Sequence, residues 1–164
     1  MAAMMSFYID APVEKVFDFF KDPTSQIDSP PLGSMKVHDV TMTEEGVGTH
    51  YSWTVTMAGV PLKGFAVYTE FVPNERIVEK DSRSLVGEWE YTFAPDGSGT
   101  RVTMEHRQRS LWAFPLLSAA VDYGTRRLNR LFVEGVKVKL EAEPTVPSQR
   151  KPAATKTRKA GAGR

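Results

Sequence analysis

The apolar positions of this chain follow a helical spacing near its start. The residues that share this spacing, three or four apart, are Val13, Val16, Phe17 and Phe20. Such a spacing gives a short helix one apolar face. Asp10 is the expected N-cap of the helix. Pro12 fits in the first turn, because the backbone N–H groups there have no partner within the helix and proline lacks this group. Residues 6–9 predict a short strand before it.

After residue 34 the apolar period changes from about four to two, the spacing of β-strands. Short turns containing Gly, Pro, Asn or Asp separate the strand-like runs. The runs cover residues 35–43, 49–57, 63–71, 76–83, 86–94 and 100–109. Parallel neighbours would require long crossover connections, and these connections are short. The sequence therefore predicts an antiparallel meander.

The same alternation assigns side chains to the two faces of the predicted sheet. In most runs one face is apolar and aromatic and the other is polar, which is typical of a sheet that contacts water on one side. In residues 63–71 we place Phe65, Val67, Thr69 and Phe71 together on one face. The run 76–83 buries little in either register, so its faces stay unassigned.

A long helix is predicted from about residue 114 to residue 142. Its apolar stripe consists of Leu117, Ala120, Val121, Gly124, Leu128, Leu131, Phe132 and Gly135. At 1.5 Å per residue such a helix is roughly 40 Å long, enough to cross the sheet. It is the one predicted element long enough to cover the apolar face.

The chain resembles the SRPBCC superfamily, the START-like, birch-pollen-allergen-like proteins. Residues 9–17, IDAPVEKVF, are similar to the strand-to-helix junction with which members of this family begin. Similar segments follow in order at 71–78 (FVPNERIV), 87–93 (GEWEYTF) and 99–103 (GTRVT). The resemblance covers about residues 5–142.

This resemblance implies an α+β helix-grip fold. In that fold an antiparallel sheet of about seven strands wraps around a long C-terminal helix, with one or two short helices after the first strand. The family includes polyketide cyclases and dehydratases, lipid-transfer domains, quinone-binding chaperones and chaperone regulators. Membership therefore implies a hydrophobic cavity for a lipid, polyketide or quinone-like ligand, and it leaves the function open.

The predicted inner face supplies the candidate ligand-binding residues. The sheet positions are Tyr51, Trp53, Val67, Thr69, Trp89, Tyr91, Met104 and His106, and the helix positions are Leu117, Val121, Leu128 and Phe132. At the aliphatic positions a filled core is the simpler interpretation. The polar-tipped aromatic residues and His106 each need a partner for a buried polar atom, which a ligand, a water molecule or another side chain can supply.

Three function classes follow. The first is a non-catalytic protein that binds or carries a hydrophobic small molecule. The second is a polyketide cyclase or dehydratase-type enzyme, with His106 as acid/base and Tyr51 and Tyr91 orienting carbonyls. His106 could then pair with Glu79 or Asp81, if the strand 76–83 turns these carboxyls inward. The third is a protein-interaction or chaperone-regulator module.

Several kinds of site are not expected. The chain has no cysteine and only three histidines, far apart in sequence, so we expect no metal. It contains no phosphate loop, dinucleotide fingerprint or nucleophile-elbow motif, and we expect no cofactor.

The turn at Gly97 predicts a register for the last hairpin. On the inner face Trp89 lies opposite His106, and the next pairs along are Tyr91 with Met104 and Phe93 with Val102. On the outer face Glu88 meets Arg107, and Glu90 meets Glu105 unfavourably.

Charge is distributed unevenly along the 164 residues, whose net charge is +1. Residues 144–164 hold six of the 21 basic residues and no acidic one, which leaves 15 basic against 20 acidic residues, a net −5, in the rest. This segment is poor in apolar residues, so we predict a folded domain over residues 1–143 and a disordered basic tail over 144–164. The tail suits weak contact with anionic lipid or nucleic acid. The chain shows neither a signal peptide nor an apolar run of membrane-spanning length, so we expect a cytoplasmic protein.

Overall fold

The computed structural model describes residues 2–25, 35–57, 60–84, 86–108 and 115–142. In chain order the elements are β1 (Ala2–Ile9), α1 (Val13–Lys21), β2 (Met35–Thr41), β3 (His50–Met57), β4 (Val60–Val72), β5 (Arg76–Arg83), β6 (Gly87–Asp96), β7 (Gly99–Gln108) and α2 (Pro115–Glu141). The predicted strands and the long helix are all present. One short helix follows the first strand within the described residues.

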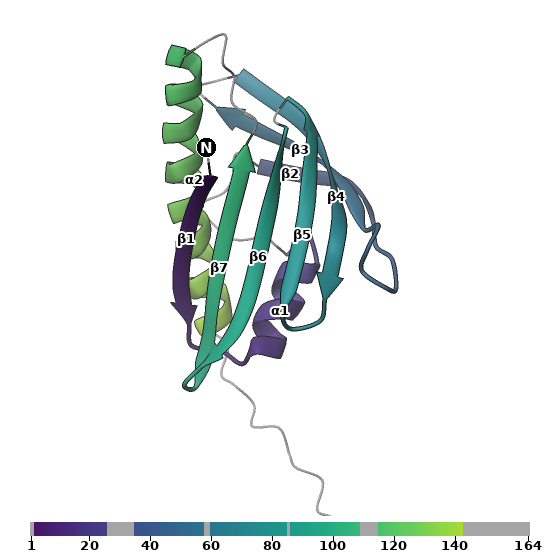
Figure 1. Ribbon diagram of the computed structural model, residues 1–164, viewed down its shortest axis with the longest axis vertical. Coiled ribbons are helices and arrows are strands. Elements are labelled where there is room, and N and C mark those ends of the chain that lie inside the picture. The colour runs from purple at the N-terminus through teal and green to yellow at the C-terminus, as the bar shows by residue number, and fades with distance from the viewer. Residues whose placement is uncertain (1, 26–34, 58–59, 85, 109–114, 143–164) are drawn as a thin grey trace, which may run out of the picture.

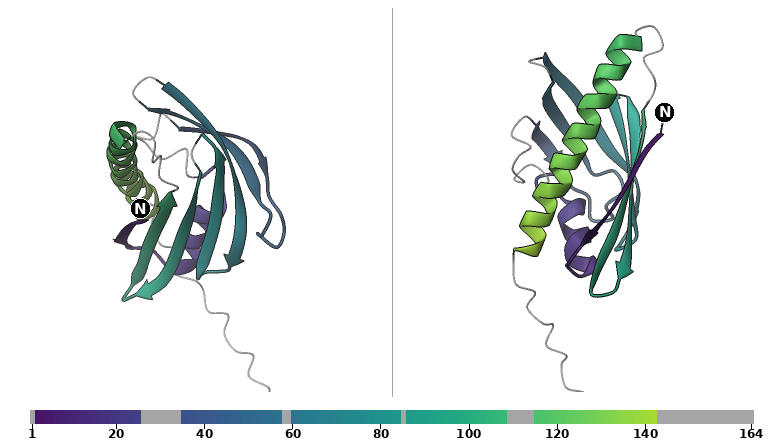
Figure 2. Two further views of the ribbon diagram at one scale, coloured as in Figure 1. Left: turned by 45° about the horizontal axis from the view of Figure 1, so that its top comes forward. Right: turned by 90° about the vertical axis from the view of Figure 1, so that its left-hand side faces the viewer.

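The seven strands form one sheet in the order β1-β7-β6-β5-β4-β3-β2, and every neighbouring pair is antiparallel. Strands β2 to β7 follow one another as the predicted meander, and β1 pairs with β7 at the far edge. The sheet is curved, and both helices lie on its concave side (Figures 1 and 2). This arrangement is the helix-grip fold expected from the sequence.

Helix α1 starts differently from the prediction. Its N-cap is Pro12, and no side chain caps the helix, so the assignment of Asp10 as N-cap is wrong. The backbone turns before the helix, where the Ala11 N–H donates to the carbonyl of Ile9. Asp10 consequently faces the β6–β7 turn, and its carboxylate accepts hydrogen bonds from the Tyr8 and Ser98 hydroxyls at 3.3 and 3.2 Å.

The buried side of α1 fills the core at one end of the concave face. Phe17 packs edge-on against Phe71 and Phe93, with ring centroids 5.1 and 5.4 Å apart. Phe20 contacts Phe93 at 5.3 Å and reaches Phe132 of α2 at 5.8 Å. These aromatic contacts join the sheet and the two helices.

Two predicted site residues of β4 do not lie on the predicted face of the sheet. Ala66 pairs with the buried Tyr51, whereas Val67 pairs with His50 and Lys80 on the outer face. A bulge between Tyr68 and Glu70 then shifts the pairing with β5. The predicted inward positions of Val67 and Thr69 are therefore wrong, because strict alternation counted backward from Phe71 does not include this bulge.

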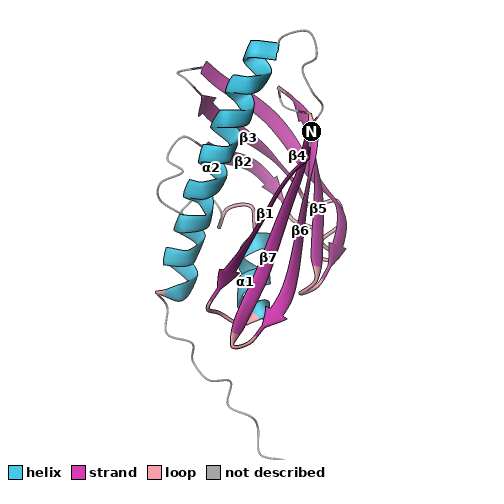
Figure 3. Cartoon of the chain, turned by 60° about the vertical axis from the view of Figure 1, so that its left-hand side comes forward, coloured by secondary structure: helices cyan, strands magenta, loops and turns pink. Residues whose placement is uncertain are grey.

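Helix α2 runs along the open side of the sheet, with α1 beside its C-terminal half (Figure 3). In that half Phe132, Val136 and Leu140 are buried. The predicted ligand-contacting side chains Leu117, Val121 and Leu128 lie outside the described residues, as does the predicted tail 144–164. No helix in the described part of the chain is long and apolar enough to cross a membrane.

The last hairpin has the predicted register. Trp89 pairs with His106, Tyr91 with Met104 and Phe93 with Val102 on the inner face.

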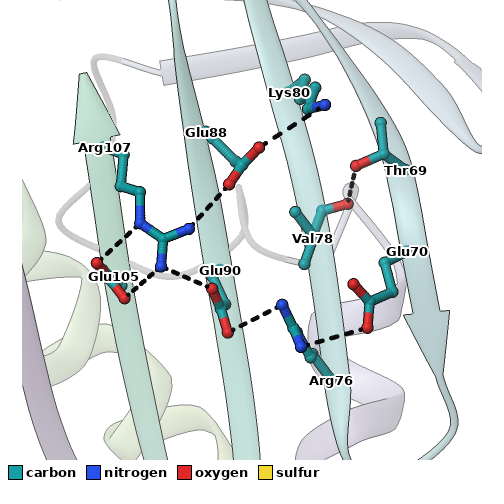
Figure 4. A network of polar contacts seen from close by, with 9 residues as sticks. All are labelled: Thr69, Glu70, Arg76, Val78, Lys80, Glu88, Glu90, Glu105 and Arg107. Carbon is teal, nitrogen blue, oxygen red and sulfur yellow. Dashed lines mark hydrogen bonds and ion pairs between the residues drawn. The ribbon is translucent and has the colours of Figure 1, made fainter. Parts of the chain in front are cut away.

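The outer face of the same hairpin resolves the predicted clash of Glu90 with Glu105. The Arg107 guanidinium lies between three carboxylates and contacts Glu88, Glu90 and Glu105 at 3.1, 3.2 and 2.9 Å (Figure 4). Arg76 makes a second contact with Glu90 at 3.2 Å. One arginine thus links the acidic residues of two strands, which the pairwise register did not include.

Candidate functional site

Strand β5 turns two carboxyl groups toward the helices. Glu79 pairs with Trp89 and with Tyr68, and both of these partners belong to the inner face. Asp81 lies two residues further along on the same face, and Ile77 lies two residues before. The Glu79 side chain is 4% exposed, and Asp81 is half-buried.

Two tyrosines hold the Glu79 carboxyl group. The Tyr51 hydroxyl of β3 donates a hydrogen bond to Oε2 at 2.9 Å. The Tyr91 hydroxyl of β6 donates to Oε1 at 3.4 Å. The carboxyl group is therefore contacted from the strands on either side of the β4–β5 pair.

Two tryptophans hold the Asp81 carboxyl group in the same way. The indole N–H of Trp53 on β3 donates to Oδ1 at 2.8 Å, and that of Trp89 on β6 donates to Oδ2 at 3.0 Å. Each of the four carboxyl oxygens thus accepts one hydrogen bond from an aromatic side chain. We call Tyr51, Trp53, Glu79, Asp81, Trp89 and Tyr91 the carboxyl–aromatic cluster.

Two small residues of β4 leave room for the hydrogen bonds between β3 and β5. Trp53 pairs with Gly64, and Tyr51 pairs with Ala66. A Cβ atom added at Gly64 would lie 2.0 Å from Cζ2 of Trp53, so the indole lies directly over the bare backbone of the glycine. The side chains from β3 can therefore cross β4 and reach β5.

Burial changes the acidity of both carboxyl groups. The pKa of Glu79 is raised to about 8, first by removal from water and then by the neighbouring Asp81 charge, while the hydrogen bonds from Tyr51 and Tyr91 oppose this rise. Burial also raises the pKa of Asp81 to about 6, against the hydrogen bonds from Trp53 and Trp89. Glu79, the more deeply buried of the two carboxyls, therefore holds a proton more readily, and Asp81 ionises more readily.

The tyrosine hydroxyls in this region stay protonated. Burial, followed by the negative charge of Glu79, raises the pKa of Tyr51 and of Tyr68 well above the ordinary value. The pKa of Tyr91 is raised for the same two reasons. These hydroxyls act as hydrogen-bond donors over the whole physiological pH range.

His106 is buried on the inner face, as predicted. Its ring stacks on the indole of Trp89, with centroids 3.9 Å apart and planes 6° from parallel. In the strand pairing, Trp89 of β6 lies between its partners His106 on β7 and Glu79 on β5. The condition for a pair of His106 with Glu79 or Asp81, an inward turn of these carboxyls, is met by both residues. The pair itself stays a prediction, since the hydrogen bonds described for the two carboxyls come from Tyr51, Tyr91, Trp53 and Trp89.

The structure brings together four of the predicted site residues, Tyr51, Trp53, Trp89 and Tyr91. They surround Glu79 and Asp81, which were not in the predicted ligand-binding set. Met104 and Phe132 are buried in the same layer. Glu79 and Asp81 escaped assignment because acidic residues normally mark a solvated face. The alternation of the strand did indicate their position. Ile77 stands two residues before Glu79, so the two side chains lie on the same face, and Ile77 is buried.

The described side chains offer no grouping of three or more metal-ligating residues. The cluster instead combines two carboxyl groups of raised pKa with four aromatic hydrogen-bond donors. Such an arrangement can accept hydrogen bonds from a polar ligand group or exchange a proton with it.

Comparison with known proteins identifies the family of the chain. A family model described as polyketide cyclase / dehydrase and lipid transport matches residues 3–141. A search of the curated proteins finds no significant relative.

Solved structures with the same fold have low sequence identity. A Thermus thermophilus protein is 21% identical with a TM-score of 0.72, over 87% of this chain and 98% of that one. A Mycobacterium smegmatis protein is 20% identical with a TM-score of 0.67, over 86% and 91% of the two chains. The protein Ara h 8.0201 is 10% identical with a TM-score of 0.63, over 87% and 99%. At these identities the similarity shows the fold alone.

Proposed function

The chain belongs to the polyketide cyclase/dehydrase and lipid transport family, and we propose that it binds a hydrophobic small molecule between the inner face of the sheet and helix α2. The observation that carries this proposal is the carboxyl–aromatic cluster, in which a few polar groups are enclosed within an otherwise apolar layer. A binding site for a hydrophobic ligand combines apolar walls with a few fixed polar groups in this way.

The two ends of the inner face differ in what they contain. Aromatic contacts of α1 with Phe71, Phe93 and Phe132 fill one end with packed rings. Toward the other end β5 carries Glu79 and then the half-buried Asp81. We therefore place the apolar part of the ligand along the inner face next to Tyr51 and Trp53, with its polar group at the carboxyls.

Native mass spectrometry of the purified protein, followed by solvent extraction, tests this function. Titration with dodecanol, followed by the fluorescence of Trp53 and Trp89, gives an affinity for a defined probe. Ala66→Leu should weaken dodecanol binding, because it adds volume beneath the Tyr51 side chain. Val67→Leu is the matched control, since the neighbouring residue lies on the outer face. Equal affinity of both variants and of the wild type, or no binding at all, would contradict the proposal.

An enzyme of the cyclase or dehydratase type is the second candidate, and the buried Glu79 favours it. A carboxyl that stays protonated at neutral pH can donate its proton to a carbonyl oxygen or a leaving hydroxyl. The acid/base role predicted for His106 then passes to Glu79, and Tyr51 and Tyr91 orient this carboxyl. With a poly-β-ketone thioester as substrate, Glu79→Gln should lower turnover by about a hundredfold or more. Unchanged turnover in this variant would exclude the role.

A further inference from the structure

The polar end of the proposed binding layer holds two carboxyl groups with no cationic partner among the described side chains. Asp81 is the less deeply buried of the two and therefore the one that ionises more readily, and in the described part of the chain neither Asp81 nor Glu79 forms an ion pair with a lysine or arginine. Arg83 follows Asp81 by two residues, but its side chain is exposed and pairs with neither carboxyl. A buried charge of this kind is costly unless a partner neutralises it.

The hydrogen bonds within the cluster determine what it can offer a ligand. The N–H and O–H groups of Trp53, Trp89, Tyr51 and Tyr91 already point at carboxyl oxygens. Each oxygen of the Asp81 carboxylate has a second lone pair, so Asp81 still has capacity to accept hydrogen bonds. Among the described side chains, this site therefore lacks a donor with positive charge.

Access to the pair is easier at one residue than at the other. Asp81 and Trp89 are half-buried, whereas Glu79 is 4% exposed and lies deeper along β5. A ligand group is therefore expected to meet the more exposed Asp81 carboxyl before it meets Glu79.

We propose that the hydrophobic ligand of this chain has a basic amine at its polar end, and that the ammonium group binds the Asp81 carboxylate between Trp53 and Trp89. This inference rests on the proposed function, because it names the class of ligand for the same site. An ammonium group supplies the positive charge that the cluster lacks and further N–H donors for the remaining lone pairs of Asp81, and charge-assisted hydrogen bonds are the stronger kind. A fatty-acid anion would place a second negative charge beside Asp81, so the site discriminates against it.

A comparison of three ligands with the same chain and different head groups tests the inference. Wild-type protein is titrated at neutral pH by calorimetry with dodecylamine and dodecanoate, each below its micelle concentration, and with dodecanol below its solubility limit. We expect dodecylamine to bind about tenfold or more tightly than dodecanol, with dodecanoate weakest. Dodecanoate binding as tightly as dodecylamine would overturn the inference, whereas dodecanol would still report on the proposed function. Absence of binding by all three would overturn both.

Variants locate the preference in the structure. Asp81→Asn keeps the shape of the side chain and removes its charge, so the preference for dodecylamine over dodecanol should fall to about onefold. Glu105→Gln removes one negative charge from the outer face and should leave the preference intact. Circular dichroism and thermal melting confirm that each variant is folded before titration. An amine preference that survives Asp81→Asn would show that the head group binds elsewhere.

Discussion

The indole N–H of Trp53 on β3 donates a 2.8 Å hydrogen bond to Asp81 on β5, across the intervening strand β4. The side chain can cross because Gly64 lies directly beneath its ring. A residue without a side chain in one strand thus determines which groups meet from the two strands beside it.

Gly64→Ala should separate these two groups. The added Cβ would lie 2.0 Å from the Trp53 ring, so the indole must move and its hydrogen bond to Asp81 is lost. We expect the free energy of unfolding to fall by about 1–3 kcal/mol. The pKa of Asp81 should rise, because the Trp53 hydrogen bond lowers it. Carboxyl carbon NMR gives the pKa, and denaturant unfolding gives the stability.

A double-mutant cycle with Trp53→Phe controls for effects of alanine that do not involve the indole. If Gly64→Ala acts through Trp53, the two substitutions should be strongly non-additive in stability. Additive effects would mean that the glycine serves some other purpose in β4.

Glu79 should make the protein less stable as the pH rises. The pKa of Glu79 is raised from 4.5 to about 8, mainly by burial, so between these values the folded chain holds a proton that the unfolded chain has released. The free energy of unfolding then falls by about 1.4 kcal/mol per pH unit through this window and stays level above it. Among the described residues, the titratable groups near Glu79 are Asp81, the buried tyrosines and His106 beyond Trp89, and Asp81 adds its own fall in the lower part of the window.

Glu79→Gln is the test of this pH dependence, because glutamine resembles the protonated acid. The variant should show a flatter dependence of stability on pH and should be more stable than the wild type above about pH 8. Urea unfolding at several pH values measures both. A wild type whose stability rises across the window would contradict the assignment.

Removal of the tyrosine hydroxyls should raise the pKa of Glu79 further. Both hydrogen bonds favour the ionised carboxylate, and the bond from Tyr51 is shorter than that from Tyr91, 2.9 against 3.4 Å. Tyr51→Phe should therefore have the larger effect on the pKa and Tyr91→Phe the smaller, as measured by carboxyl carbon NMR. The opposite ranking would show that the two hydroxyls do not share the carboxyl in this way.

Arg107→Gln should destabilise the outer face in a salt-dependent manner. Without the guanidinium, Glu88, Glu90 and Glu105 face one another across β6 and β7 with no shared cation between them. The melting temperature should fall at low ionic strength, and added salt should reduce the difference because it screens exposed charges. Glu105→Gln in the same background should restore part of the loss. A deficit that is independent of salt would point to packing of the arginine stem.

Local pattern determined the elements of this protein and their order. Alternation with period two and short turns specify an antiparallel meander, and a run of helical spacing near the C-terminus specifies the covering helix. The register of the last hairpin also followed from its turn, since a two-residue period leaves few alternatives once one face is apolar. Trp89 opposite His106 is an example of a contact that is fixed at this local level.

Tertiary structure decided the positions that depend on more than one strand. The bulge at Tyr68 reversed the faces of Val67 and Thr69, because one extra residue changes the parity of everything before it. The sequence pattern alone favours a solvated position for Glu79 and Asp81. In the folded sheet, Tyr51 and Trp53 of β3 extend across β4 and donate hydrogen bonds to these two carboxyls. A buried carboxyl group is tolerated only where donors meet it, and those donors lie on strands distant in sequence. Their meeting is a property of the folded sheet that no single stretch of the chain contains.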